Sequence, residues 1–140
     1  MKKKTVFLLQ GNKEINEELK EKFDATEEYE VVGTSVDAIS AISMIADKKP
    51  NFLITELVLS GYDGLSVIEK VKKENENIKC IVVGSVHQSM EELFYKKGTS
   101  CIMSFPMDYE LLRNRIEKLY KSKKIEEEKI LMNWKKGKEL

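Results

Sequence analysis

The sequence predicts an α/β protein built on a doubly wound, five-stranded parallel sheet with the repeating pattern (β/α)5. Three observations carry this prediction. Five short apolar runs alternate along the chain with five longer segments whose apolar residues recur at helical spacing. Each run is almost continuously apolar, as expected for a strand buried on both faces of a parallel sheet. Right-handed crossovers between parallel strands then limit the topology to doubly wound forms.

The predicted elements follow one another in a regular order. The strands cover residues 6–9, 31–36, 52–55, 80–83 and 101–103. The helices are marked by apolar residues in helical register: Ile15, Leu19 and Phe23; Ile39, Ile42, Met44, Ile45 and Ala46; Leu65, Ile68 and Val71; Met90, Leu93 and Phe94; Leu111, Leu112, Ile116, Leu119 and Tyr120. Pro50 ends the second helix, and Gly98 suits the C′ position of the fourth.

A change of composition near residue 120 divides the chain into two parts. The length of 140 residues suits a single domain, which we place at residues 1–120. The chain has no net charge, but residues 121–140 hold seven lysines against four glutamates, so an excess of negative charge falls on the rest. We expect residues 121–140 to form a charged helical tail, either as an extension of the fifth helix or docked on the body or another chain.

Several classes of protein are excluded by composition. The longest apolar runs are too short for a membrane span, and the apolar run after Met1-Lys2-Lys3-Lys4 is too short for a secretory signal. Two cysteines without a CxxC motif and a single histidine argue against a disulfide scaffold and a metal site. We therefore expect a cytoplasmic protein with no cofactor and no resident metal.

In a doubly wound sheet, functional sites lie where the strands end at their carboxyl side. Here those positions hold Gln10-Gly11-Asn12, the turn after Ser35, Glu56 with the loop that follows, Val83-Gly84-Ser85 and Ser104-Phe105-Pro106. No GxGxxG motif and no nucleophile–base pair occurs among them, so an enzyme that shares this fold remains only a third hypothesis.

Two stretches at these loops resemble a known family. Residues 52–64, Phe-Leu-Ile-Thr-Glu-Leu-Val-Leu-Ser-Gly-Tyr-Asp-Gly, are similar to the phosphoacceptor strand and loop of receiver domains of bacterial response regulators. Residues 97–100 and 105–108, Lys-Gly-Thr-Ser and Phe-Pro-Met-Asp, are similar to that family's last strand and loop. The resemblance covers residues 4 to about 120 and implies a flavodoxin-like fold. Within the family, Val31-Val32-Gly33, residues 63–69 and Met107-Asp108 most resemble the receiver of the sporulation-initiation regulator of Firmicutes.

The positions that carry chemistry in that family all depart from its pattern. The resemblance places Gln10 and Gly11 where receivers have an acidic pair that holds a divalent metal, and Glu56 where they have the phosphorylated aspartate. The threonine or serine position falls on Gly84 or, with another gap, on Val83. The phosphate-binding lysine falls on Phe105, and the switch aromatic falls on Ile102. Pro106 is retained, and the resemblance implies a cis bond before it.

These departures predict a degenerate receiver, or pseudo-receiver, that signals through protein–protein contact without phosphorylation. Metal and lysine normally neutralise the charge of the transferring phosphoryl group, and both are missing here. The alternative is a response regulator of a phosphorelay that retains a working acceptor or ligand pocket at Glu56 and controls transcription. Glu56 acting as a constitutive mimic of the phosphorylated residue is a further alternative, as is a plain carboxylate that accepts backbone N–H groups.

We expect the partner to be a protein, and a homodimer is one possibility. In receivers the face made by the fourth helix, fifth strand and fifth helix carries such contacts, and Tyr95, Arg113 and Lys118 are the residues of that face expected to be exposed. Twenty residues of tail cannot build a helix-turn-helix domain, so we expect no direct nucleic-acid binding and no membrane contact.

Overall fold

The computed structural model describes residues 2–59, 62–104 and 107–139, and it confirms the predicted fold class. Five parallel strands form one sheet in the order β2-β1-β3-β6-β7. The elements are β1 Lys4–Leu9, α1 Lys13–Asp24, β2 Tyr29–Ser35, α2 Ala38–Lys48, β3 Phe52–Glu56, β4 Val58–Leu59, β5 Tyr62–Asp63, α3 Gly64–Glu74, β6 Lys79–Val83, α4 Gln88–Lys96, β7 Thr99–Met103 and α5 Tyr109–Glu139.

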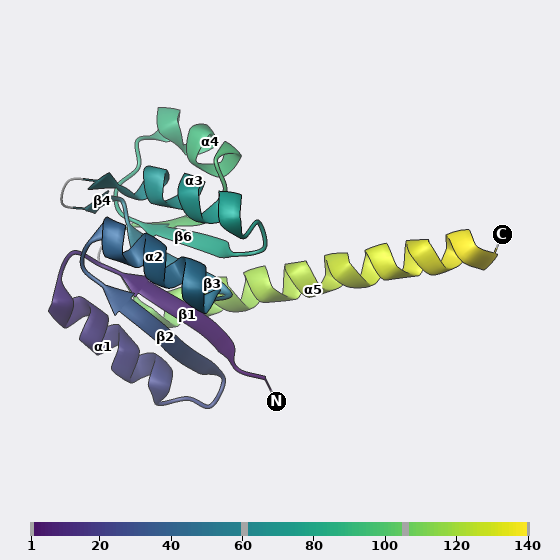
Figure 1. Ribbon diagram of the computed structural model, residues 1–140, viewed down its shortest axis with the longest axis horizontal. Coiled ribbons are helices and arrows are strands. Elements are labelled where there is room, and N and C mark those ends of the chain that lie inside the picture. The colour runs from purple at the N-terminus through teal and green to yellow at the C-terminus, as the bar shows by residue number, and fades with distance from the viewer. Residues whose placement is uncertain (1, 60–61, 105–106, 140) are drawn as a thin grey trace.

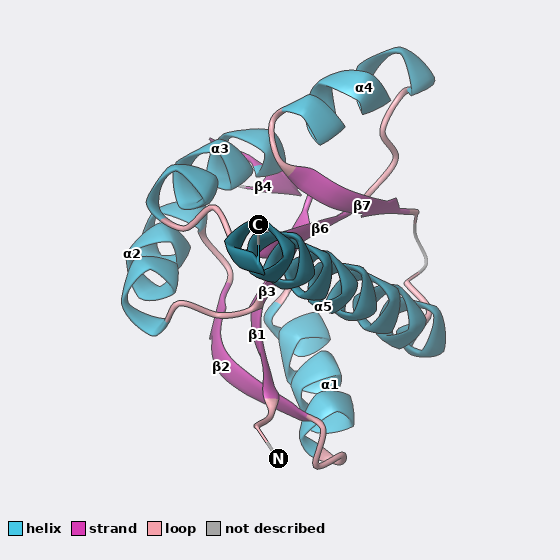
Figure 2. Ribbon diagram, turned by 90° about the vertical axis from the view of Figure 1, so that its right-hand side faces the viewer, coloured by secondary structure: helices cyan, strands magenta, loops and turns pink. Residues whose placement is uncertain are grey.

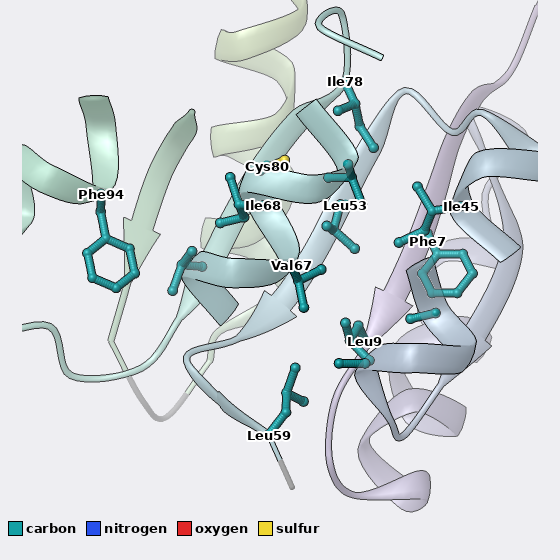
Figure 3. Close-up of a cluster of buried hydrophobic side chains, with 14 residues drawn as sticks. Phe7, Leu9, Ile45, Leu53, Leu59, Val67, Ile68, Ile78, Cys80 and Phe94 are labelled. Carbon is teal, nitrogen blue, oxygen red and sulfur yellow. The ribbon is translucent and has the colours of Figure 1, made fainter. Parts of the chain in front are cut away.

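Alternation along the strands divides the core into two layers. Phe7 and Leu9 of β1 point to one face of the sheet and belong to a buried cluster that also contains side chains of α2, α3 and α4 (Figure 3). Val6 and Leu8 point to the other face and pack with α1 and α5. All four side chains are fully buried, and each stabilises the fold by roughly 1.5–3 kcal/mol relative to an exposed position. Burial on both faces is the reason the sequence runs are continuously apolar.

The helices begin at side chains that satisfy their first backbone N–H groups. Asn12 accepts from Glu14, Asp37 from Ser40 and Asp63 from Ser66, so α1, α2 and α3 each have a polar N-cap. His87 caps α4 in the same way, with its Nδ1 accepting from the N–H of Ser89 at 3.1 Å.

The structure corrects several expectations at the edges of the sheet. The segment after β3, expected to be a loop, contains a short antiparallel pair, β4 with β5. Val36 lies beyond the end of β2 and is exposed, and Ile39 and Leu111 are exposed although they fit their helices' apolar pattern. Both β2 and β7 lie at edges of the sheet and are only partly buried, because neighbouring strands cover them on one side alone.

The two cysteines lie on neighbouring strands and are both free thiols. The register of β6 and β7 sets Cys80 opposite Thr99, while Cys101 lies opposite Ile81. Burial raises the pKa of the Cys80 thiol to about 12, which keeps it protonated and unreactive at neutral pH. Cys80 thus packs as a small core side chain.

Helix α5 is 31 residues long and continues without a break past residue 120 (Figure 1). Its first half is anchored by the fully buried Leu112 and Ile116. Glu117 on the same helix accepts from Lys4 Nζ at 2.8 Å and from the hydroxyl of Tyr29 at 2.5 Å. Burial opposes the charge of Glu117, but these hydrogen bonds outweigh it and hold the pKa of this carboxyl below its ordinary value.

Beyond residue 120 the helix projects away from the sheet. Its apolar side chains there are all at least half exposed: Ile125, Ile130, Leu131, Met132 and Trp134. In the described part of the chain, no helix is both long enough and apolar enough to cross a membrane.

Candidate functional site at the carboxyl ends of the strands

The strand register brings the predicted site positions to one edge of the sheet. Leu9 of β1 pairs with Thr55 of β3, so Gln10 and Glu56 follow side by side. Glu56 pairs with Val83 of β6. Gly84 follows Val83, so the segments that hold Gln10, Glu56 and Gly84 lie at the same edge of the sheet.

The Glu56 carboxylate is bound to the backbone of the neighbouring loop. Its Oε1 accepts the N–H of Gly11 at 2.7 Å, and the side chain is half buried at the rim of the sheet. This is the arrangement expected of a carboxylate that accepts a nearby backbone N–H. The carboxylate therefore bridges the ends of β3 and β1 through a charge-assisted hydrogen bond.

Gln10 is completely buried, and its side chain hydrogen-bonds to the backbone of β3 instead of facing the solvent at the strand ends. Its Nε2 donates to the carbonyl of Ile54 at 3.4 Å, and its Oε1 lacks a protein partner among the described residues. Asn16 of α1, also buried, donates to the carbonyls of Gln10 at 3.4 Å and Ser35 at 3.0 Å. Sequence analysis missed Asn16. Its spacing of three residues to Leu19 and seven to Phe23 places it on the buried face of α1 and was the available signal.

Gly84 occupies a place where a side chain does not fit. Its φ is +154°, and an added Cβ would lie 2.7 Å from the Cβ of Leu57. Its N–H donates to the carbonyl of Met103 at 2.8 Å, which fixes the loop against β7. Val83, the alternative position for the family's hydroxyl residue, is fully buried in the layer formed with α1 and α5.

Gly11 differs from Gly84 in having room beside it. An added Cβ at Gly11 would meet only the two carboxylate oxygens of Glu56, at 3.7 and 3.8 Å, which is ordinary van der Waals contact. Gly64 is again tight, because an added Cβ there would lie 2.4 Å from the carbonyl oxygen of Glu56. Gly64 is therefore required by the turn that leads from the β4–β5 pair into α3.

The remaining predicted positions lie on or after β7. Ile102 is partly buried and packs against the cluster that includes Phe94 of α4. Phe105 and Pro106 lie outside the described residues, and so does the predicted cis bond between them.

The donor atoms at this edge do not suit a divalent metal of the kind that receivers bind. A hard cation such as Mg²⁺ prefers several oxygen ligands with carboxylates among them. The described residues offer the carboxylate of Glu56, which already accepts from Gly11, and the neutral amide oxygen of Gln10. Nowhere in residues 2–59, 62–104 and 107–139 do three His, Cys, Asp or Glu side chains gather in a group that can hold a metal.

Comparison with known families gives the assignment. A family model described as the response regulator receiver domain matches residues 6–117. The chain belongs to the receiver domain family. A receiver is a signalling module, and the match ends at residue 117, within α5.

Solved receiver structures share the fold at low sequence identity. A CheY-like receiver domain protein from Methanospirillum hungatei superposes with a TM-score of 0.81 at 19% identity, over 89% of this chain and 99% of that chain. A LuxR-family two-component response regulator from an Aurantimonas species gives a TM-score of 0.75 at 18% identity, over 84% of this chain and 85% of that chain.

A longer curated protein matches part of this receiver. A protein-glutamate methylesterase/protein-glutamine glutaminase from Myxococcus xanthus is 30% identical over 73 residues, which is 52% of this chain and 21% of that protein. The chain thus spans about a fifth of the length of that relative.

One face of the receiver is formed by α4, β7 and α5. Figure 2 shows β7 between the two helices. Tyr95 is 48% exposed, and Lys118 is exposed as well. Arg113 is only partly exposed, and its guanidinium lies 3.0 Å from the carboxylate of Glu110 on the same helix. Arg113 is thus less exposed than Tyr95 and Lys118, and it forms an ion pair with the acid one helical turn earlier on α5.

Proposed function

We propose that this receiver is degenerate and signals through protein–protein contact that does not depend on phosphorylation. The observation that carries the proposal is the hydrogen bond from the Gly11 N–H to the Glu56 carboxylate. The residue at the acceptor position is engaged with the backbone at the position where receivers place metal ligands. The assignment of Gln10, Gly11, Glu56, Gly84, Ile102 and Phe105 to the family's functional positions is part of the proposal.

Phosphoryl transfer to this site faces two electrostatic obstacles. The developing charge on the phosphoryl oxygens is normally offset by a divalent cation and a lysine. We propose that neither is supplied here, since Gln10 and Gly11 stand at the positions of the acidic pair and Phe105 stands at the position of the lysine. Glutamate also moves the carboxylate outward by one methylene, and a displacement of about 1 Å can cost about 10²-fold in rate.

The same features argue against Glu56 as a constitutive mimic of a phosphorylated residue. A mimic requires a hydroxyl that follows the charge, and Gly84 has no room for a side chain beside Leu57. We therefore propose that the charge of Glu56 fixes the ends of β1 and β3 and does not set a switch.

The surface that we propose for partner binding is the face of α4, β7 and α5. Its helices expose large apolar side chains: Met90 is 41% exposed and Tyr95 48% exposed on α4, and Leu111 is 44% exposed on α5. β7 is an edge strand at the centre of this face (Figure 2). Aromatic residues and methionine are enriched at protein interfaces. The partner is a protein, and a second copy of this chain is the homodimer form of the proposal.

The finer assignments belong to the same proposal. We place the receiver body at residues 1–120 and a helical tail at residues 121–140, with a cytoplasmic location, no enzymatic activity and no direct contact with nucleic acid or membrane. Within the family, the likeness to the sporulation-initiation regulator of Firmicutes remains a prediction.

Limited proteolysis of the whole chain tests the boundary between the body and the tail. Trypsin is expected to cut first after lysines in residues 121–136, leaving the body intact.

The decisive experiment is incubation with acetyl phosphate and Mg²⁺, followed by intact mass measurement. We expect no phosphoryl adduct, while a receiver with the full acidic set, run in parallel, gains one. The variant Glu56→Gln separates the alternatives, because a phosphoryl gain that is lost in this variant identifies Glu56 as a working acceptor. That result would replace the proposal by the alternative of a phosphorelay response regulator that controls transcription.

A second experiment tests the interaction face. Sedimentation of the chain at about 10–200 μM reports any homodimer, and Tyr95→Ala together with Lys118→Glu is expected to weaken it. Lys48→Glu on α2, which lies outside the proposed face, is the matched control. Loss of self-association in the control and in the face variants alike would count against this surface.

A further inference from the structure

A basic hollow lies at the end of the sheet opposite Glu56. It has a volume of about 280 Å³ and is lined by five lysines and the ring of Tyr120: Lys2, Lys3, Lys4, Lys79 and Lys124. Four segments distant in sequence meet here, namely the N-terminal strand, the start of β3, the start of β6 and the part of α5 that leaves the sheet. Figure 1 shows the N-terminus on the side of the sheet from which α5 projects.

Acidic side chains offset only part of the positive charge of the hollow, although Glu27 and Glu28 line an adjoining hollow together with Lys2, Lys3 and Lys4. Lys4 is neutralised by Glu117, with Nζ and Oε1 2.8 Å apart. Lys2, Lys3, Lys79 and Lys124 form no ion pair with any residue that the structure describes. One acidic side chain, Glu127, also lines the hollow. Like charges gathered in this way repel one another, and a bound anion would relieve that repulsion.

The walls of the hollow are held by backbone and side-chain contacts. Asn51 exchanges hydrogen bonds with Thr5, its Oδ1 accepting from the Thr5 N–H and its own N–H donating to Thr5 Oγ1, both at 2.9 Å. The N–H of Lys79 donates to the carbonyl of Asn51 at 2.9 Å, which fixes the start of β6 beside them. The lining residue Phe52 is 1% exposed, so this wall belongs to the packed core.

The side of the hollow that α5 contributes is held in place by Lys4, which also pairs with Glu117 on that helix. Lys4 Nζ lies 4.9 Å from the centre of the Tyr120 ring, within the range of a cation–π contact. Lys124 follows Tyr120 by four residues and therefore extends from the same face of the helix. The hollow thus combines a fixed frame on the sheet with lysine side chains that can adjust to a ligand.

We propose that this hollow binds a small anion that carries several phosphate groups. Lysine ammonium groups bind phosphate as compact charges, and several of them can contact successive phosphates. The volume of about 280 Å³ lies near the lower end of the range for small-molecule sites, which suits a short polyphosphate chain. Binding here would cross-link the N-terminal strand, β6 and the extension of α5, and it is independent of chemistry at Glu56.

Titration calorimetry of the whole chain with tripolyphosphate tests the proposal. We expect one saturable site that weakens as NaCl is raised from about 50 to 200 mM. We expect Lys79→Gln and Lys124→Gln each to raise the Kd about threefold to fivefold, as for the loss of one exposed charge contact. The control is Lys129→Gln, five residues along α5 and about 140° around the helix from Lys124, with an expected unchanged Kd.

Two results would overturn the proposal. The first is the absence of saturable binding, which means that the hollow is not a specific site, or an equal loss of affinity in the Lys129→Gln control, which means that general surface charge is responsible. The second is sulfate binding as tightly as tripolyphosphate, which would show that several phosphates are not recognised. Amide chemical shifts provide a second measurement: tripolyphosphate is expected to move the signals of Asn51, Lys79 and Lys124 and to leave those of Gly11 and Glu56 in place.

Discussion

Replacing Gly84 by alanine tests whether the packing around this residue, which we propose for the family's hydroxyl position, leaves room for a side chain. An added Cβ would lie 2.7 Å from the Cβ of Leu57, an atom that cannot rotate away. Overpacking of this kind costs about 1–3 kcal/mol. The φ of +154° adds about 1–3 kcal/mol for a residue with a side chain. Reduced freedom of the unfolded chain returns about 0.4–1 kcal/mol, so we expect a net loss of about 2–5 kcal/mol.

Urea denaturation followed by circular dichroism measures this loss directly. In thermal melts the same free energy corresponds to a fall in Tm of about 6–15 °C, at roughly 3 °C per kcal/mol for a domain of this size. Gly11→Ala is the matched control, because its Cβ would meet only ordinary contacts at 3.7 and 3.8 Å. We expect Gly11→Ala to change the free energy of unfolding by less than about 1 kcal/mol.

A double-mutant cycle separates the two sources of the loss. In a Leu57→Gly background the overlapping Cβ is gone, so the cost of Gly84→Ala is expected to fall by about 1–3 kcal/mol. Strict additivity of the two substitutions, or an equal loss in Gly84→Ala and Gly11→Ala, would refute the steric reasoning. The family's hydroxyl position would then be open to restoration by a single substitution.

Three further predictions concern the packing, the acid stability and the capping of the fold. Leu112 is fully buried, and we expect Leu112→Ala to lower the free energy of unfolding by about 2–5 kcal/mol in urea denaturation. Leu111 beside it is exposed, and we expect Leu111→Ala to lower it by less than about 1 kcal/mol. Similar losses in the two variants would contradict the assignment of the buried and exposed faces of α5. The pKa of Glu117 is lowered on folding, so its contribution to stability is present above the ordinary pKa near 4.5 and is lost as pH falls through the lowered value. We therefore expect Glu117→Gln to flatten the dependence of the free energy of unfolding on pH between about pH 5 and 3. An unchanged pH dependence would exclude this role. Asp63→Ala removes the N-cap of α3 and should lower the free energy of unfolding by about 0.5–2 kcal/mol, with Asp63→Asn retaining most of it; equal losses in both variants would point away from capping.

The fold was predictable because its signals are local and repeated. Continuous apolar runs such as residues 6–9 require burial on both faces, and a sheet covered by helices is the architecture that supplies it. The errors lie where burial is one-sided. Ile39 and Leu111 fit the helical pattern yet are exposed, because an apolar residue beside the stripe is tolerated on the surface. The short β4–β5 pair escaped prediction because two-residue strands leave no periodicity to detect.

The residues of the candidate site could be predicted from the sequence, but most of the contacts between them could not. Sequence determined which side chains stand at the strand ends, since Gln10, Gly11, Glu56 and Gly84 each follow an apolar run directly. Whether a hydroxyl at Gly84 would fit depends on Leu57, 27 residues earlier in the chain, and no local pattern records that distance. The helical spacing of Asn16 indicates its burial, but its hydrogen bonds to the carbonyls at the ends of β1 and β2 depend on the tertiary structure.

The sequence by itself therefore determined the layers of the fold and the chemical groups available at the strand ends, because both follow from residue type and short-range spacing. Tertiary structure alone decided which of those groups meet. It joined the Glu56 carboxylate to the Gly11 N–H and gathered Lys2, Lys79 and Lys124 at the opposite end of the sheet. The physical reason is that strand register and helix direction, set by the packing of the whole core, bring distant residues within interaction range.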